Sequence, residues 1–458
     1  MSDELRSAVE AALAEHRAQA VTVDDLEPIS MGASKDLWRF RATIGGQTHR
    51  LVLRRDSPGR ANPDGMRREA AVMQAASRAG VPVPHVWWVG DGQDAIGAPA
   101  IIMDHVEGES LPKRILRTVE ANGTGVALAQ QLGGIAARVH SVELGDELAV
   151  AGLSMGGTAE PYEVAAAQSP AIEIARRWLN ERPPAPGAPS LVHGDLRLGN
   201  ILVDGDIRAA LDWELAHLGD PVEDLGWLCV RVWRFGSPHR AAGFGSVGDL
   251  LDGYASVAGW RPSEHDVLWW EVRGTIRWAF MCLKQAGRFT DGSEPSLELA
   301  LIGRRFAENE WDLLLALGLA DPDLMVAPGP EDGAVESISR HGAPSGPVLL
   351  EALASELTER GDYRSRLLAR AAGVAMRESV LGPELVRVHA EHLRALGMES
   401  EEELAAEIRG GVRLTPEVMA AVHSGIAQRL LVWDPSYAES TDVPSDRSVG
   451  EIWPTSTS

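Results

Sequence analysis

The chain has 458 residues, of which 45% are hydrophobic and 24% charged, and its 66 acidic and 43 basic residues give a formal net charge of −23. This length predicts about two to four domains, and the composition excludes a fibrous repeat and wholesale disorder. A surface this negative repels nucleic acids and anionic lipids, so neither is expected as a partner.

Cysteine usage and the N-terminal sequence both favour the cytoplasm. Cys229 and Cys282 are the two cysteines, and neither lies in a Cys/His cluster, which excludes a disulfide scaffold and a structural zinc site. Residues 1–20 place charges along an apolar stripe, so they predict an amphipathic helix and not a signal peptide. No apolar run of about 18 residues indicates a membrane span.

The first hundred residues predict a small antiparallel sheet with one helix laid across it. Four short runs have the pattern of strands: 37–42, 50–54, 83–89 and 100–104. A helical pattern covers 64–79 and ends at Gly80. We therefore expect a first lobe over residues 1–105.

Helical patterns dominate the remainder of the chain. They predict a helical lobe at 106–317, which also contains the catalytic loop discussed below. A stretch rich in Pro, Gly, Asp and Ser at 318–346 indicates a linker. A separate helical module is expected at 347–434, with helices at 347–360, 363–380 and 383–396 and a last helix that begins after Thr415 and ends near Trp433. Residues 435–458 have the composition of a disordered tail.

The most informative segment is 191–214, LVHGDLRLGNILVDGDIRAALDWE. Asp195 and Asn200 lie in a loop before a strand, and the following Asp-Gly pair predicts a tight hairpin turn. This turn places Asn200 opposite residues 209–211, so Asp212 returns beside Asn200. An amide oxygen and a carboxylate side by side, with Asp195 upstream, make a hard-oxygen site suited to Mg²⁺. The alternative is a polar hairpin whose Asp and Asn residues only form turns.

The same spacing matches the catalytic loop and the metal-binding aspartate of kinases, where one Asp orients or deprotonates the acceptor hydroxyl and the Asn and second Asp hold metal on the triphosphate. With His-Gly-Asp at 193–195 and Asp-Trp-Glu at 212–214, the sequence resembles aminoglycoside-phosphotransferase-like small-molecule kinases. The resemblance implies an α+β, bilobal protein-kinase-like fold with ATP and Mg²⁺ as cofactors. It makes Asp195 the catalytic residue and Asn200 and Asp212 the metal ligands. Arg197 would contact the transferred phosphate or form an ion pair with Asp195 or Glu214.

Two segments of the first lobe would bind the nucleotide. Gly32, Ser34 and Lys35 precede a strand-like run, where a kinase Gly-rich loop covers the phosphates. Met103 and His105 fall at the hinge between the lobes, which would bind adenine through main-chain groups.

Arg54 falls where protein kinases carry a lysine, and the resembling families commonly have Leu-Arg there. A guanidinium can bind α- and β-phosphate oxygens bidentately, and Glu69 in the following helix would hold it in place. The alternative for Arg54 and Glu69 is a surface ion pair of little energetic value. His140 and Asp224 also match the family pattern, and we expect both to have structural roles.

The resemblance covers residues 26–317 and is closest to the kinase-like domains associated with acyl-CoA dehydrogenases. The residues that carry it are Leu53-Arg54-Arg55, the Val-Pro-Val-Pro run at 81–84, Gly-Ala-Pro at 97–99, Gly108 and the HGDxRxGN loop. Such domains imply phosphorylation of the hydroxyl of a hydroxyacyl-CoA, of the 4-hydroxyacyl type, in catabolism. A small-molecule alcohol linked to CoA is therefore the expected substrate.

The segment 347–433, with Val-Ala-Met-Arg-Glu at 374–378, resembles a small helical domain of unknown function that accompanies such kinases. It implies a supporting or substrate-gating module that packs on the kinase part or mediates self-association; a bundle that only stabilises the kinase is the alternative. Two rival functions stay open: a kinase for an aminoglycoside, macrolide or other polyol, and a nucleotide-binding pseudokinase that regulates a partner.

Overall fold

The structure is a computed structural model that describes residues 2–31, 35–57, 59, 61–145, 148–149, 152–156, 169–185, 187–325 and 344–439. The chain divides into two compact units, each built from two stretches of sequence: Met1–Gly157 with Pro184–Glu271, and Thr158–Pro183 with Val272–Ser458. This division differs from the expected domains, because the lobe expected at 106–317 contributes to both units.

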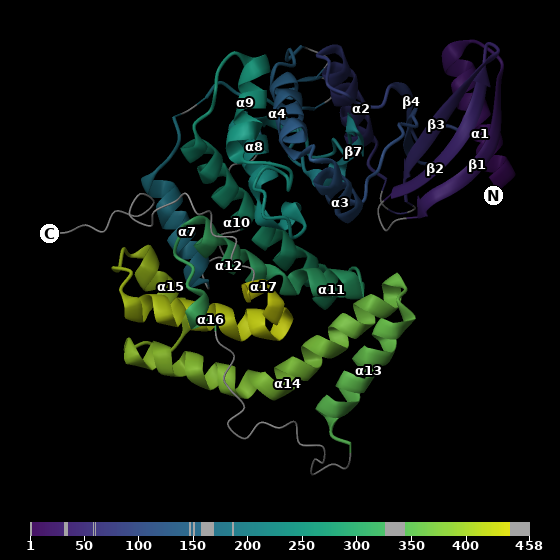
Figure 1. The fold of residues 1–458 in the computed structure, drawn as a ribbon. Coiled ribbons are helices and arrows are strands. Elements are labelled where there is room, and N and C mark those ends of the chain that lie inside the picture. Colours follow the sequence, from purple (N-terminus) through teal and green to yellow (C-terminus); the bar gives the residue numbers. More distant parts are fainter. Residues whose placement is uncertain are drawn as a thin grey trace. The chain divides into compact units, whose positions relative to one another are not determined.

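The first unit contains an antiparallel sheet (Figure 1). It has five strands in the order β1-β2-β3-β5-β4. Its strands are β1 (Val21–Met31), β2 (Lys35–Ile44), β3 (Gln47–Asp56), β4 (Val86–Asp91) and β5 (Pro99–Asp104). The sequence pattern did not indicate β1, since two register shifts and Pro28 break its alternation. An edge strand tolerates both, because only one of its sides pairs with the sheet.

Helices cover both faces of this sheet. Helix α1 (Ser2–Arg17) packs on the face that carries Leu51 and Leu53, and helix α2 (Pro63–Arg78) packs on the face that carries Val52. Because side chains alternate along a strand, Arg54 lies on the same face as Val52. The fold therefore turns the Arg54 side chain toward α2.

The rest of the first unit combines helices with two small antiparallel ladders, β6–β9 and β7–β8. Its elements are α3 (Pro112–Asn122), α4 (Gly125–His140), β6 (Ser190–Val192), β7 (Ile201–Asp204), β8 (Asp206–Ala210), β9 (His217–Gly219), α8 (Val222–Cys229) and α9 (Val247–Ala258). Helices α4 and α9 cross closely at two glycines. A Cβ on Gly133 would lie 2.0 Å from the Leu250 carbonyl oxygen, and one on Gly253 would lie 1.9 Å from that of Gln130. Larger residues at either glycine would push the helices apart.

The second unit is helical. The long helix α10 (Glu264–Thr290) contains the boundary between the units at Glu271, and the other helices are α7 (Pro170–Glu181), α11 (Leu297–Arg304), α12 (Phe306–Ala316), α13 (Gly346–Arg360), α14 (Tyr363–Ala395), α15 (Glu401–Arg409), α16 (Pro416–Trp433) and α17 (Pro435–Glu439). The expected break before Pro383 is absent, because α14 continues through it. Buried residues on both sides of Pro383, Val374 and Leu385, keep the two halves packed. No described helix combines the length and the apolar composition that crossing a membrane requires.

Buried polar contacts join α12 to α16 and α17. Glu310 on α12 is fully buried and accepts two hydrogen bonds of 2.8 Å from Arg429 on α16. The Trp433 indole donates to Glu308 at 2.7 Å, and the Tyr437 hydroxyl donates to Asp312 at 2.8 Å. Helix α17 thus extends the ordered helices five residues into the range that composition assigned to a disordered tail.

Candidate active site

The β7–β8 hairpin brings the two expected metal ligands to its open end. Ile201 pairs with Ala210, and the main-chain N–H of Leu211 donates to the Asn200 carbonyl oxygen at 2.8 Å. This confirms the register expected from the turn. Asn200 therefore stands directly before β7, and Asp212 follows two residues after β8 in the left-handed region, with φ 65°.

The Asp195 carboxylate is fixed by donors from three side chains. The Asn200 amide nitrogen donates to Oδ2 at 2.7 Å, and the Arg197 Nε and the Trp227 indole Nε1 donate to Oδ1 at 3.0 and 2.9 Å. The same amide nitrogen also donates to the Asp195 carbonyl oxygen at 2.9 Å. Because the amide nitrogen faces Asp195, Asn200 Oδ1 is directed away from it and is available to a cation. The Asp195 side chain stays 14% exposed.

The loop before Asp195 is held by the buried carboxylate of Asp224. This carboxylate accepts the main-chain N–H groups of His193 and Gly194 at 2.8 and 3.0 Å and lies 3.1 Å from His140 Nε2. Burial alone would raise the pKa of Asp224, but His140 and His193 outweigh it and lower that pKa. Gly194 has φ 79°, and a Cβ there would lie 2.4 Å from the Leu215 carbonyl oxygen, so the motif requires glycine. His140 and Asp224 thus have the expected structural contacts.

Arg54 forms a buried, bidentate ion pair with Glu69 on α2. Its Nη2 donates to Glu69 Oε2 at 2.8 Å, and its Nη1 contacts the other carboxylate oxygen. Nη2 also lies 3.6 Å from Asp212 Oδ1. Burial alone would lower the pKa of Arg54, but the charges of Glu69, Asp212 and Glu214 raise it. The pairing expected from the sequence is present, and it lies in the interior instead of on the surface.

Lys35, at the start of β2, joins the same cluster. Its Nζ donates to Glu214 at 2.7 Å and lies 3.6 Å from Glu69. Sequence reasoning missed Glu214 as a partner of Lys35, since the two residues are 179 positions apart. Gly32 and Ser34, expected in the phosphate-covering loop, lie outside the described residues.

The electrostatics around Asp212 fit a cation. Burial, followed by repulsion from Glu214, raises the pKa of Asp212 to about 6, against the opposing effect of Arg54. Among the described residues, no cluster of three or more His, Cys, Asp or Glu side chains is arranged to hold a metal. A magnesium ion here would take Asn200 Oδ1 and the Asp212 carboxylate from the protein, and phosphate oxygens and water for the rest, which is its usual coordination with nucleotides.

The segment expected to bind adenine continues from β5. Met103 is buried in this strand, opposite Val52 of β3. The main-chain N–H of Asp104 donates to the His85 carbonyl oxygen, and that of His105 donates to the Arg50 carbonyl oxygen, both at 2.9 Å. The His105 N–H is therefore engaged within the protein, which removes this donor from the set expected to bind adenine.

An acidic pocket of about 430 Å³ lies beyond this segment, within the first unit. It is formed by the chain after β5, by α3, by the start of α4 and by the β7–β8 turn. Three carboxylate residues line it: Glu107, Glu109 and Asp204. Glu107 is paired with Arg50 and Glu109 with Arg114, so Asp204 is the carboxylate of this lining that has no ion pair among the described residues.

Comparisons with known proteins show the family to which the chain belongs. The model of the phosphotransferase enzyme family matches residues 25–260, and that of a domain of unknown function, DUF6285, matches residues 355–437. Acyl-CoA dehydrogenase family member 10 of Mus musculus is 31% identical over 198 residues, which are 40% of this chain and 18% of that protein. Family member 11 of Homo sapiens is 29% identical over 254 residues, which are 50% of this chain and 32% of that protein. The chain thus spans less than a third of the length of these curated relatives.

A solved structure extends the likeness to the fold. The crystal structure of a candidate aminoglycoside phosphotransferase from Ralstonia eutropha aligns with a TM-score of 0.50 and 25% identity, and it covers 68% of this chain and 97% of its own. The α+β fold expected from the sequence is confirmed, with an antiparallel sheet in the N-terminal part and helices in the C-terminal part. The chain belongs to the phosphotransferase enzyme family, has a kinase-like fold and carries a DUF6285 domain in its C-terminal part.

Proposed function

We propose that the protein is an ATP- and Mg²⁺-dependent kinase that phosphorylates an alcohol hydroxyl. The observation that carries this proposal is the hairpin that places Asn200 and Asp212 at one end, with Asp195 bound to Asn200 at 2.7 Å. Family membership supplies the reaction class, and the three side chains supply the groups that phosphoryl transfer to a hydroxyl requires.

Asp195 would accept the hydrogen bond of the substrate hydroxyl and then its proton. As the substrate oxygen bonds to the γ-phosphorus, the bond to the bridging oxygen of ADP breaks, and Asp195 later releases the proton to water. Arg197 fixes the carboxylate at 3.0 Å and is itself stacked 4.5 Å from the centre of the Trp233 ring. We therefore assign Arg197 mainly to positioning, with its guanidinium next to the path of the transferred phosphate. Such alignment contributes more to phosphoryl transfer than proton removal does.

Arg54, Lys35, Gly32 and Ser34 would position the triphosphate. Glu69 holds the Arg54 guanidinium in one orientation, so little conformational entropy is lost when it binds phosphate oxygens. Magnesium bound to Asn200 and Asp212 would neutralise the charge that develops on the transferred group. The chain around Met103 and His105 would lie beside the adenine, without the His105 N–H as a donor.

The proposed acceptor is a hydroxyacyl-CoA of the 4-hydroxyacyl type, and the proposed compartment is the cytoplasm. Two observations support the acceptor: the curated relatives are acyl-CoA dehydrogenase family members, and a DUF6285 domain follows the kinase region in the same chain. Cys229 and Cys282 are buried and are not joined in a disulfide, as expected in a reducing compartment.

We assign the module at 347–434 a supporting role. Arg429 binds the buried Glu310 of α12, and Arg409 binds Glu173 of α7 at 3.1 Å. Both pairs join the module to helices of the preceding part of the chain within the second unit, which favours packing in one polypeptide over self-association.

The test is an ADP-release assay with purified protein, ATP and Mg²⁺ across 3-, 4- and 5-hydroxyacyl-CoAs and a panel of aminoglycosides. The proposal predicts ADP release with one or more hydroxyacyl-CoAs, and a matching phosphorylated product by mass spectrometry. The Asp195→Asn variant serves as the control for contaminating kinases. Release with aminoglycosides alone would reject the acyl-CoA proposal, and no release with any acceptor would favour a pseudokinase.

A specific observation favours a second candidate. Arg50 and Arg114 pair with Glu107 and Glu109 of the pocket, but Asp204 has no ion pair among the described residues, so the pocket would favour a cationic polyol such as an aminoglycoside over the phosphates of coenzyme A. The acceptor panel separates the two candidates directly.

A further inference from the structure

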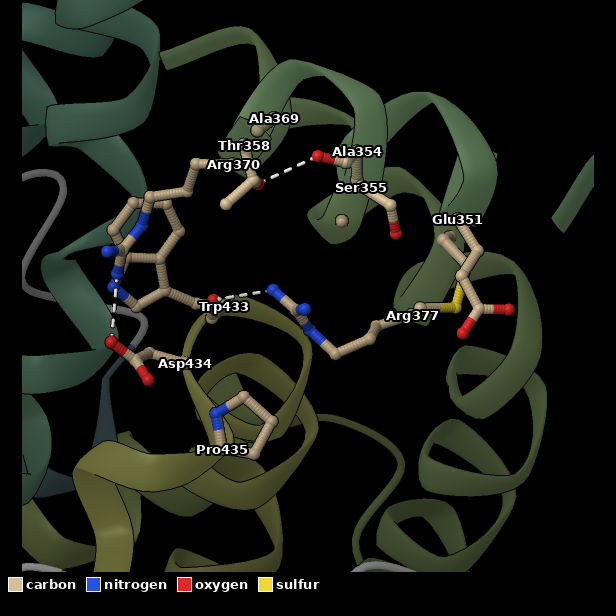
Figure 2. Close-up of a pocket in the computed structure, with 12 residues that line it drawn as sticks. Glu351, Ala354, Ser355, Thr358, Ala369, Arg370, Arg377, Trp433, Asp434 and Pro435 are labelled. Atoms are coloured by element: carbon tan, nitrogen blue, oxygen red, sulfur yellow. Dashed lines mark hydrogen bonds and ion pairs between the residues drawn. The ribbon is translucent and has the colours of Figure 1, made fainter. Parts of the chain in front are cut away.

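A second hollow, open to solvent and called the cavity below, lies in the C-terminal module, entirely within the second unit. It has a volume of about 600 Å³, in the range of small-molecule sites, and lies between α13, α14 and the junction of α16 with α17 (Figure 2). The residues that matter for its chemistry are Glu351, Ser355, Gly373, Met376, Arg377 and Trp433. Met376 and Arg377 belong to the Val-Ala-Met-Arg-Glu run that the proposed kinase chemistry does not use.

Arg377 contributes a positive charge to this cavity without a carboxylate partner. Its Nε and Nη2 donate to the carbonyl oxygens of Val432 and Trp433 at 2.8 and 2.9 Å, as Figure 2 shows for Trp433. No carboxylate among the described residues forms an ion pair with it. Burial, together with the charge of Arg370, lowers the pKa of Arg377 against the effect of Asp434. An anion in the cavity would restore the balance of charge.

Arg370, which also lines the cavity, differs from Arg377 because it has a carboxylate partner. Its Nη2 is 2.9 Å from Asp434 Oδ2, and its guanidinium lies 4.0 Å from the centre of the Trp433 ring. Arg370 is therefore paired within the protein, and Arg377 is the arginine of the lining that has no carboxylate partner among the described residues.

The remaining lining is largely apolar and leaves room for a ligand. Met376, Trp433 and Pro435 supply apolar surface, and Gly373 opens space on α14. A Cβ built on Gly373 would approach Nη1 of Arg377 at 3.2 Å, so this third guanidinium nitrogen lies over the glycine that lines the cavity. Glu351 on α13 adds one negative charge, which disfavours a ligand with several negative charges.

We propose that this cavity binds a small organic monoanion, a carboxylate that pairs with Arg377 and carries an apolar chain along Met376 and Trp433. The competing explanation is purely structural: an arginine that donates to the last carbonyl groups of a helix stabilises that helix end, here the end of α16. The two explanations predict different ligand binding when a substitution fills the cavity but Arg377 is kept: binding is lost only if the cavity is a binding site.

The experiment is isothermal titration of the full-length protein with hexanoate, with neutral hexanol and cationic hexylamine as matched probes. Saturable binding of hexanoate that is at least tenfold tighter than that of either matched probe supports the proposal. Absence of saturable hexanoate binding, or equal binding of hexanol, would overturn it.

Two variants locate the site. Arg377→Gln removes the charge, and Gly373→Leu fills the cavity and shifts the Arg377 guanidinium, because a Cβ there would lie 3.2 Å from Nη1; it keeps the charge and suits a helix interior. Each should weaken hexanoate binding at least tenfold, and Arg394→Gln, at an exposed arginine of the same helix, should change it less than twofold. If Arg377→Gln fails to fold by circular dichroism, Gly373→Leu decides alone. Unchanged hexanoate affinity in Gly373→Leu would reject this cavity as the site.

Discussion

The indole Nε1 of Trp227 donates a hydrogen bond of 2.9 Å to Asp195 Oδ1, from helix α8 to the loop that carries the proposed catalytic residue. Arg197 donates to the same oxygen, so the two donors together limit rotation of the Asp195 carboxylate. The other oxygen, Oδ2, then faces Asn200. Trp227 is therefore a positioning residue of the proposed kinase reaction and not only part of the core.

Trp227→Phe keeps an aromatic ring, although a smaller one, at this buried position and removes the N–H donor. A lost hydrogen bond to a charged acceptor is worth about 1.5–3 kcal/mol, and we expect kcat to fall about tenfold or more while KM for ATP stays unchanged. Steady-state ADP release measures both. Trp269→Phe in the same unit is the matched control, and a kcat within twofold of wild type in Trp227→Phe would contradict the positioning role.

Asp195→Asn should reduce kcat by about 10²–10⁴-fold, the usual contribution of a positioned acid–base group. ATP affinity should persist, because Asp195 is assigned to the acceptor hydroxyl and not to the triphosphate. Turnover and isothermal titration with ATP separate the two effects. A variant that keeps more than a tenth of wild-type turnover would show that Asp195 is not the catalytic residue.

The sequence predicted those parts of the site that depend on local geometry. The Asp-Gly turn indicated the hairpin and placed Asn200 roughly opposite residues 209–211, but not the bulge between Leu202 and Val203. Chain order alone indicated the pair of Arg54 with Glu69. Contacts that depend on packing between distant elements were not predictable. Lys35 with Glu214 is an example, because no periodicity or spacing links residues so far apart.

Three further features were missed for different physical reasons. The alternation of β1 is broken by bulges and a proline that only an edge strand tolerates. The main-chain N–H of His105 donates to the Arg50 carbonyl oxygen. This hydrogen bond depends on the direction of the chain after β5, which sequence patterns do not encode. In the sequence, Trp227 could equally well be a core tryptophan. Only the direction of its indole N–H, toward Asp195, distinguishes a positioning role from a role in the core.

Glu69→Gln should destabilise the first unit by about 3 kcal/mol, since removing one partner of a buried ion pair leaves the charge of Arg54 insufficiently compensated. The combined Arg54→Met and Glu69→Met variant should recover part of this loss and still bind ATP weakly. Thermal unfolding and ATP titration of the variants test these two effects. A Glu69→Gln protein as stable as wild type would show that the pair is not structurally important.

The raised pKa of Asp212, about 6, predicts a pH-dependent stability of the metal-free protein. Because the folded state holds this proton more tightly than the unfolded state, stability falls as pH rises from about 4 to about 6. With the side chain 42% exposed, solvent screening limits the cost at pH 8 to about 1 kcal/mol.

Asp212→Asn removes this cost. In EDTA at pH 8 the variant should unfold roughly 1–2 °C above wild type, and the difference should vanish at pH 4. Asp204→Asn, at the exposed β7–β8 turn, is the control. An Asp212→Asn protein less stable than wild type at pH 8 would contradict the electrostatic picture of the site.

The central claim is that Asn200 and Asp212 together hold Mg²⁺ on bound ATP, and calorimetric titration with ATP in Mg²⁺ and in EDTA tests it most directly. We predict that Mg²⁺ strengthens ATP binding to the wild-type protein at least tenfold. Asn200→Ala and Asp212→Asn should lose this gain while they keep the affinity measured in EDTA. An undiminished Mg²⁺-dependent gain in Asp212→Asn would contradict the account.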